Sequence, residues 1–272
     1  MLRARSLMRA RSLNSGVIAA MAPDASTDFG FQSVPWAEKT ARVREVFDSV
    51  AGRYDLMNDL MSGGLHRLWK AAFITWLRPR AEMHLLDLAG GTGDIAFRFL
   101  AAGGGRVTVA DINQEMLLVG QKRAQGWRAK RRGMPGAIDW LCANGESLPI
   151  PDASVDAVTC AFGIRNMTDK VQALSEMHRV LKPGGRFMCL EFSHLALPGL
   201  AGLYDKYSFQ VVPRLGRMVA GDEASYRYLA ESIRTFPDQE AFAAMITDAG
   251  LDNVSYRNLA GGIAAMHSAW RI

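Results

Sequence analysis

The chain has 272 residues, of which 49% are hydrophobic and 22% are charged, and this is the composition of an ordinary folded protein. Its formal net charge of +5 is concentrated at the N-terminus, while the rest of the sequence is close to balance, which argues against nucleic acid as a partner. No run approaches the roughly 20 consecutive apolar residues of a membrane-spanning helix.

Residues 1–28 form a basic extension in which the string RARSL occurs twice and the first acidic residue is Asp24. A basic, serine-containing and acid-free segment is typical of a mitochondrial transit peptide. A disordered bacterial extension and a start codon assigned too early also explain it, and the three readings stay open. We therefore expect one folded domain over residues 29–272. We expect it in the bacterial cytoplasm, peripheral to the inner membrane, with the mitochondrial matrix side as the alternative.

The middle of the chain alternates between short apolar runs and helical patterns, after an amphipathic helical segment at 36–79. Strand–helix alternation at this spacing predicts parallel β-α-β units, and so an α/β fold with a doubly wound, mostly parallel sheet. The expected strands are 84–90, 106–112, 138–144, 155–162 and 186–193, and the expected helices are 94–102, 113–130 and 169–181.

The C-terminal part departs from this alternation. A helix at 239–249 ends before Gly250, and two strand-like runs, 253–259 and 263–271, are joined through a glycine pair. We expect these runs to form an antiparallel hairpin that brings the sheet to seven strands. An insertion at 194–238, rich in Tyr and Arg, precedes them. Like the segment 36–79, it flanks the strand ends at which open α/β sheets bind ligands, and we expect it to act as a lid.

The three cysteines fit neither a disulfide framework nor a metal site, so we expect buried thiols in a reducing compartment. They are Cys142, Cys160 and Cys189.

A glycine-rich loop follows the first expected strand. Its residues are Gly90, Gly91, Thr92 and Gly93, and Asp94 begins the next helix. Such a loop lets a ligand approach the backbone. Its pattern also satisfies a dinucleotide fingerprint, but the charge of Asp94 would oppose a pyrophosphate at the helix N-terminus. A cationic ligand without phosphates, such as S-adenosylmethionine, would be favoured there. The alternative is that Asp94 only caps the helix.

Three further elements belong to the same edge of the sheet. Asp111 ends the second strand, where a carboxylate can accept hydrogen bonds from both ribose hydroxyls. Asn144 and Gly145 follow the third strand and could hold an adenine edge. The string RVLKPGG at 179–185 ends a helix in a turn. In this order, the four elements resemble the class I S-adenosylmethionine-dependent methyltransferases.

Four longer strings narrow the resemblance. They are YDLMNDLMSGGLHRLWK at 54–70, LDLAGGTGD at 86–94, FGIRNMTDK at 162–170 and GDEASYRYLAESIRTFPDQ at 221–239. Together they closely resemble the ubiquinone/menaquinone biosynthesis C-methyltransferase family, from about Phe29 to the C-terminus. The resemblance implies methyl transfer from S-adenosylmethionine to a ring carbon of a polyprenyl benzoquinol or a demethylmenaquinol.

The same resemblance implies which residues hold the cofactor. The family's cofactor positions match Thr92, Asp111, Asn144 and Gly145, whereas a serine of the family is replaced by Ala161. The family motifs do not decide between ubiquinone and menaquinone chemistry.

Methylating a ring carbon requires an ionised neighbouring hydroxyl, close alignment and removal of a proton. We expect Arg165 to hold the developing phenolate through its fixed positive charge. The same fixed charge makes Arg165 a poor general base. A pair with an acid such as Asp169 is its alternative. Asn166 could orient the ring oxygen or a water, and Tyr54 could hydrogen-bond a quinol hydroxyl.

Further substrate contacts are expected from Asn58, in the string at 54–70, and from Tyr226 and Arg227 in the insertion. Helix capping or core packing is the alternative for each. His66 lies in an amphipathic helical string, and a structural role is favoured for it over proton transfer. No spacing of His, Cys, Asp or Glu indicates a metal site.

Other functions remain as alternatives. A methyltransferase for another small apolar acceptor would share the cofactor site, and a non-catalytic scaffold would keep it without turnover. An NAD-dependent oxidoreductase fits the glycine pattern but not Asp94. An RNA methyltransferase would need a basic face that the sequence lacks. Because the expected substrate carries a polyprenyl tail, we expect transient contact with a membrane surface or a complex with other quinone-biosynthesis enzymes. Whether the protein forms a homodimer is left open.

Overall fold

The core of the molecule is a seven-stranded sheet in the order β5-β4-β3-β6-β7-β9-β8. The computed structural model describes residues 26–50, 58–59, 62–130, 136–195, 214 and 223–272. The strands of the sheet are β3 (His84–Leu88), β4 (Arg106–Asp111), β5 (Ala137–Cys142), β6 (Val155–Ala161), β7 (Leu181–Phe192), β8 (Asp252–Leu259) and β9 (Ala264–Trp270).

The first five of these strands are parallel, and β9 runs antiparallel between β7 and β8. The expected α/β sheet with an antiparallel C-terminal hairpin is therefore confirmed. β3 has β4 on one side and β6 on the other, so the strand order reverses there. Open α/β sheets bind ligands at the carboxyl ends of the strands beside such a reversal.

Two cores lie on opposite faces of the sheet, because successive side chains of a strand point to opposite sides. Leu85 packs with helices α3 and α4, and its neighbour Leu86 packs with α6 and α10. The α-helices on the two faces and beyond the strand ends are α1 (Trp36–Val50), α3 (His66–Leu77), α4 (Asp94–Ala101), α5 (Gln114–Lys130), α6 (Lys170–Val180), α9 (Glu223–Thr235) and α10 (Gln239–Asp248) in the part of the chain that the structure describes.

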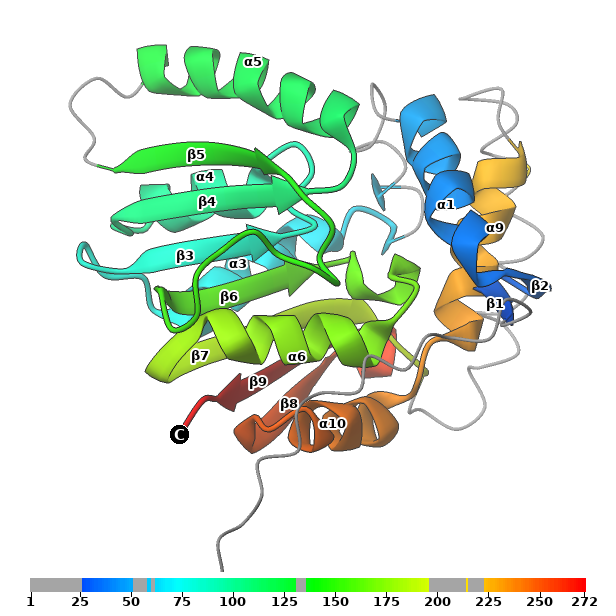
Figure 1. Ribbon diagram of the computed structural model, residues 1–272. Helices are drawn as coiled ribbons and strands as arrows, with labels where there is room; N and C mark the ends of the chain where they lie inside the picture. The colour runs from blue at the N-terminus through cyan, green and yellow to red at the C-terminus, as the bar shows by residue number, and fades with distance from the viewer. Residues whose placement is uncertain (1–25, 51–57, 60–61, 131–135, 196–213, 215–222) are drawn as a thin grey trace, which may run out of the picture.

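The carboxyl ends of the parallel strands point toward a cap made of α1 and α9, on the right in Figure 1. A short antiparallel hairpin of β1 (Ser26–Phe29) and β2 (Gln32–Pro35) joins this cap. It is fixed by Phe29, whose ring stacks on that of Tyr228 at 4.2 Å, and by the Phe31 N–H, which donates to Glu231 Oε2 at 3.1 Å. The sequence did not predict this hairpin, and β1 begins three residues before Phe29, the expected start of the domain.

Three other sequence expectations need correction or qualification. Strand β7 starts at Leu181, so the Lys-Pro-Gly-Gly turn expected before the strand lies within its bounds. Cys142 is exposed, whereas Cys160 and Cys189 are buried as expected. Much of the insertion 194–238 lies outside the described residues, and α9 is its main described element. None of the helices that the structure describes is both long and apolar enough to cross a membrane.

Candidate functional site

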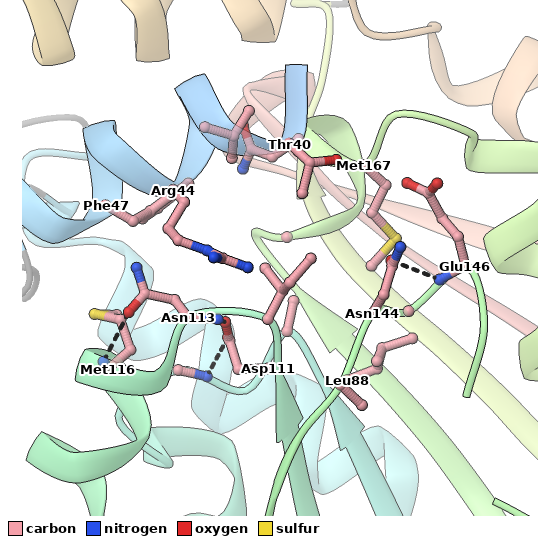
Figure 2. A pocket seen from close by; sticks show the side chains of 18 of the residues that line it. Thr40, Arg44, Phe47, Leu88, Asp111, Asn113, Met116, Asn144, Glu146 and Met167 are labelled. Atoms are coloured by element: carbon pink, nitrogen blue, oxygen red, sulfur yellow. Dashed lines mark hydrogen bonds between the residues drawn. The ribbon is translucent and has the colours of Figure 1, made fainter. Parts of the chain in front are cut away.

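A hollow of about 770 Å³, counted together with the open solvent space at its mouth, lies between α1 and the carboxyl ends of the strands β3, β4 and β6. Figure 2 shows α1 contributing Thr40, Arg44 and Phe47 from one side, while Asp111 and Asn144 face them from the other. We call this space the main hollow. Its few convergent polar groups, set among apolar side chains, suit a small-molecule ligand.

Asp111 ends β4 on the floor of the main hollow. Its Oδ2 accepts a hydrogen bond from the Gly91 N–H at 2.9 Å, and its Oδ1 accepts one from the Asn113 N–H at 2.8 Å. Burial raises the pKa of Asp111 to about 6, although these backbone donors oppose the shift. Each carboxylate oxygen has a further lone pair, so Asp111 can also accept hydrogen bonds from a ligand diol.

Gly91 needs its lack of a side chain. Its φ of 52° is left-handed, and a Cβ there would lie 3.0 Å from Met116 Cε. The turn places the Gly91 N–H against Asp111 and leaves the backbone open to the main hollow. Asn144 and Gly145 line the same hollow, with Asn144 Oδ1 fixed by the Glu146 N–H at 3.0 Å.

A second, smaller hollow with about 370 Å³ of empty space shares Ala89 and Gly91 with the first. We call it the second hollow. Its other lining residues are Lys70, Asp87, Gly90, Thr92, Asp94, Ile95 and Ala161. Four predicted loop positions, from Gly90 to Thr92 together with Asp94, therefore do line a cavity, but only Gly91 reaches the main one.

Asp87 is one residue of the second hollow that sequence reasoning missed, and Lys70 is another. Asp87 is 1% exposed, its Oδ1 accepts from Thr159 Oγ1 at 2.9 Å, and its Oδ2 has no hydrogen-bond partner in the part of the chain that the structure describes. Burial raises its pKa to about 7. A buried carboxylate oxygen without a partner is costly, and a cationic or hydrogen-bond-donating ligand would satisfy it. The signal in the sequence was an acidic residue inside an otherwise apolar strand.

Asp94 does not cap its helix, because Gly93 is the N-cap and makes no side-chain cap. Its Oδ2 accepts from Lys70 Nζ at 2.9 Å and its Oδ1 from Arg98 Nε at 3.1 Å. Burial alone would raise the pKa of Asp94, but Lys70 and Arg98 outweigh it and hold the pKa below its usual value. Asp94 is thus an ionised carboxylate with two cationic partners.

The remaining loop residues have structural contacts. The Thr92 hydroxyl accepts from Arg123 Nη1, and a Cβ on Gly93 would lie 2.8 Å from the Trp140 ring. Gly93 lines neither hollow as the described residues define them. Its left-handed φ of 81° makes the tight turn from the loop into α4.

Arg165 forms a buried ion pair with Glu191, not with the Asp169 that the sequence suggested. Its Nη1 lies 2.7 Å from Glu191 Oε1 and also donates to the Phe162 carbonyl at 2.7 Å, and both charged side chains are 2% exposed. Burial raises the pKa of Glu191, while the Arg165 charge opposes the shift. Among the described residues, Arg165 is not part of the lining of either hollow.

Through its hydrogen bond to the Phe162 carbonyl, Arg165 holds a strained residue that lines the main hollow. Phe162 directly follows β6 and has a φ of 59°, a left-handed conformation that is rare for a bulky side chain. Ala89, in the facing loop, has a φ of 52°, and a Cβ added to Gly163 would lie 2.4 Å from the Ala89 Cβ. Backbone strain of this kind is stored at functional sites and held by surrounding contacts.

Asn166 lines the main hollow from the short 3₁₀ turn at Ile164–Asn166. The Tyr228 hydroxyl donates to its Oδ1 at 3.1 Å, and its Nδ2 is buried without a partner among the described residues. Burial raises the pKa of Tyr228 far above its usual value, so the phenol stays protonated and remains a donor. This contact leaves the amide N–H₂ of Asn166 available to a ligand oxygen.

The other predicted substrate residues lie elsewhere or outside the description. Tyr54 is outside the described residues. Asn58 and Tyr226 are buried, and neither lines the hollows. Arg227 is exposed, pairs with Glu223 at 2.8 Å and borders a shallow depression beside β1 and β2. His66 is buried with its Nε2 at 2.9 Å from Asp59 Oδ1, which agrees with the structural role expected for it.

Relatives of this chain cover nearly all of it. The model of the ubiE/COQ5 methyltransferase family matches residues 36–271. A protein named "Ubiquinone/menaquinone biosynthesis C-methyltransferase UbiE" from Methylobacterium nodulans is 59% identical over 92% of this chain and 99% of the relative. A protein of the same name from Acidiphilium cryptum is 58% identical over 91% of this chain and 97% of the relative.

Solved structures show the same fold at low sequence identity. A S-adenosylmethionine-dependent methyltransferase from Thermotoga maritima superposes with a TM-score of 0.60 at 16% identity, over 85% of this chain and all of the other. Phosphoethanolamine N-methyltransferase 2 of Haemonchus contortus gives a TM-score of 0.59 at 14% identity, over 84% of this chain and 60% of the other. Fold, family model and full-length relatives agree, and the chain belongs to the ubiE/COQ5 methyltransferase family.

Proposed function

We propose that the protein transfers the methyl group of S-adenosylmethionine to a ring carbon of a prenylated quinol, in ubiquinone or menaquinone biosynthesis. The observation that carries this proposal is the identity of 58–59%, over more than nine-tenths of the chain, to proteins named as C-methyltransferases of these routes. The two adjoining hollows supply the independent support, because their polar groups match the cofactor.

The residues present fit S-adenosylmethionine on three counts. Asp111 offers carboxylate lone pairs to the ribose diol, and the open backbone at Gly91 admits the ligand beside it. Asn144 and Gly145 line the adenine side of the main hollow. The orphaned Oδ2 of Asp87 in the second hollow suits the ammonium of the methionine end. The bound cofactor supplies a methyl group already activated by its positive sulfur.

The acceptor ring belongs where the two hollows meet, next to Ala89 and Gly91. Phe162 and Asn166 line that region from the end of β6. In this proposal the Phe162 ring packs on the quinol face, and the Asn166 amide donates to the ring oxygen whose charge develops on ionisation. Arg165 is a positioning residue: its guanidinium fixes the Phe162 carbonyl and the turn that carries Asn166.

The raised pKa of Asp87 gives cofactor binding a pH dependence. The free carboxyl has a pKa of about 7, whereas a bound ammonium requires the ionised form. Below pH 7 binding must therefore expel a proton, and we expect affinity for S-adenosylhomocysteine to fall by up to about tenfold per pH unit between pH 7 and pH 5. The ligand's own amino group stays charged throughout this window.

Isothermal titration calorimetry over that window measures the slope. Asp111, with a pKa of about 6, adds a second contribution at the acid end. The matched variant Asp87→Asn should bind S-adenosylhomocysteine more weakly at pH 7. Its affinity should no longer depend on pH above about pH 6. An unchanged slope in Asp87→Asn would contradict the assignment of the ammonium to this carboxyl.

The prenyl tail of the proposed substrate calls for contact outside the two hollows. We propose that the protein meets its substrate at a membrane surface or from another enzyme of quinone biosynthesis. Such contact would involve the exposed apolar side chains of Leu65, just before α3, of Leu68 on α3 and of Phe31 between β1 and β2. A homodimer is compatible with the proposal but is not required by it.

The direct test offers methyl-labelled S-adenosylmethionine with short-tailed demethylated benzoquinol and naphthoquinol acceptors separately. We expect label on a ring carbon of at least one acceptor, and a loss of roughly 100-fold in kcat for Asn166→Ala, because one donor to a developing oxyanion is worth that much. Cofactor binding should change little in this variant. If the protein binds cofactor but labels neither quinol, the proposed acceptor is wrong.

A further inference from the structure

Lys70 is a buried cation at the edge of the cofactor site that the proposed reaction has not used. It lies on α3 and is 4% exposed, and its Nζ is 2.9 Å from Asp94 Oδ2 and 5.9 Å from the centroid of the Phe162 ring. It lines the second hollow together with Asp87. The position of the Lys70 ammonium is therefore fixed by its own helix α3, by Asp94 on α4 and by the Phe162 ring after β6.

The contact with Asp94 uses only part of what Lys70 can donate. An ammonium has three N–H donors. In the described part of the chain, the Lys70 ammonium donates one hydrogen bond, to Asp94. Asp94 does not need Lys70 for neutralisation, since Arg98 already pairs with its other oxygen at 3.1 Å. Burying an ammonium for structure alone is unfavourable, because its desolvation often exceeds the gain from one ion pair.

The charges around the second hollow match an α-amino acid end. Asp87 presents a carboxylate oxygen with no partner, and Lys70 presents an ammonium with unused donors. The two groups are electrostatic neighbours, as Lys70 is among the charges that act on Asp87. The methionine end of S-adenosylmethionine carries an ammonium and a carboxylate on one carbon, so each ligand charge meets an opposite charge of the protein.

We propose that Lys70 is the counter-ion for the α-carboxylate of the cofactor's methionine end and that Asp94 holds it in position. Asp94 then acts through Lys70, and not directly on the cationic ligand that its place in the sequence favoured. This inference rests on the cofactor of the proposed function but not on its quinol acceptor.

The test compares two ligands that differ only in this carboxylate, S-adenosylmethionine and decarboxylated S-adenosylmethionine. Dissociation constants are measured by calorimetry, without any acceptor, for the wild-type protein and for Lys70→Met. We expect the wild-type protein to prefer the carboxylated ligand by roughly 30-fold, the value of one charge-assisted hydrogen bond. We expect Lys70→Met to bind the two ligands within about threefold of each other.

A third ligand, 5′-methylthioadenosine, lacks the whole amino acid end and reports whether the main hollow is intact. Lys70→Met should bind it as the wild-type protein does, to within about threefold. The matched control is Lys182→Met, which removes another Lys–Asp contact, 2.7 Å from Asp156, away from the hollows. This control should keep the full preference for the carboxylated ligand.

The outcomes separate the possible failures. If Lys70→Met weakens all three ligands equally, Lys70 is structural and the inference is overturned. If it weakens both amino acid ligands equally but not methylthioadenosine, Lys70 acts on another group of that end, and the inference is again overturned. If the wild-type protein binds none of the ligands, the cofactor of the proposed function fails. If Lys70→Met does not fold, Lys70→Gln takes its place, and the same preference decides.

Discussion

Replacing Asp111 by Asn should weaken the binding of S-adenosylmethionine by roughly 100-fold or more. The carboxylate accepts two backbone hydrogen bonds and is proposed to accept two more from the ribose hydroxyls. Hydrogen bonds to a charged acceptor contribute about 1.5–3 kcal/mol each. The amide of Asn offers one acceptor oxygen in place of two, and its N–H₂ would face either a ligand hydroxyl or the N–H of Gly91 or Asn113.

Calorimetric titration with S-adenosylhomocysteine measures this loss. Asp139→Asn is the matched control, because Asp139 is a half-exposed partner of Arg106 on the neighbouring strand and lines neither hollow. Thermal unfolding without ligand shows whether the fold survives the change. Affinity in Asp111→Asn within threefold of the wild-type value would rule out the proposed ribose contact.

Replacing Arg165 by Ala should have the largest effect on stability. Removing one partner of a buried ion pair leaves the other without compensation, at a cost of roughly 3–5 kcal/mol. For a domain of this size that corresponds to a melting temperature lower by about 10 °C. Turnover should fall as well, since the contact with the Phe162 carbonyl is lost and Phe162 need not keep its left-handed conformation.

A double variant separates the two effects. Arg165→Met combined with Glu191→Met replaces the pair by apolar side chains, a change that is often neutral for stability. We expect the melting temperature to recover and kcat to stay low, because neither methionine can hold the Phe162 carbonyl. The dissociation constant of S-adenosylhomocysteine should stay within about tenfold, since Arg165 does not line the hollows. Recovery of kcat together with stability would show that Arg165 has no positioning role.

The sheet could be predicted from sequence because its strands are short apolar runs that alternate with helical patterns. The hairpin β1–β2 could not, since its strands have four residues each and only Val34 among them is buried. It forms because α1 and α9 offer a surface to Phe29, and this surface comes from parts of the chain far apart in sequence. Local patterns carry no information on such contacts.

The residues of the candidate site also fall into those that local sequence patterns locate and those that depend on contacts distant in sequence. Gly91, Asp111, Asn144 and Asn166 follow strand ends, and parallel strands bring such positions to one edge. The partner of Arg165 could not be found this way: Asp169 is nearer in sequence, but Glu191, on the adjacent strand β7, is nearer in space. Asp87 and Lys70 were missed because each lies within an apolar element, where a charged residue is easily assigned to the surface.

The place of α1 has a consequence for how the enzyme completes a cycle. Thr40 of α1 shares a hydrogen bond with Thr168 at 3.1 Å, and Asp48 accepts one from Asn113 Nδ2 at 2.8 Å, so the helix is attached to the loops on both sides of the main hollow. Outward movement of α1 would widen the main hollow, which the helix lines with Thr40, Arg44 and Phe47. The two hydrogen bonds contribute about 1 kcal/mol each to this attachment, and Val43, Val46 and Phe47 add apolar packing to it. Substitutions at Thr40 or Asp48 are therefore expected to change the rate of product exchange without touching the reacting atoms.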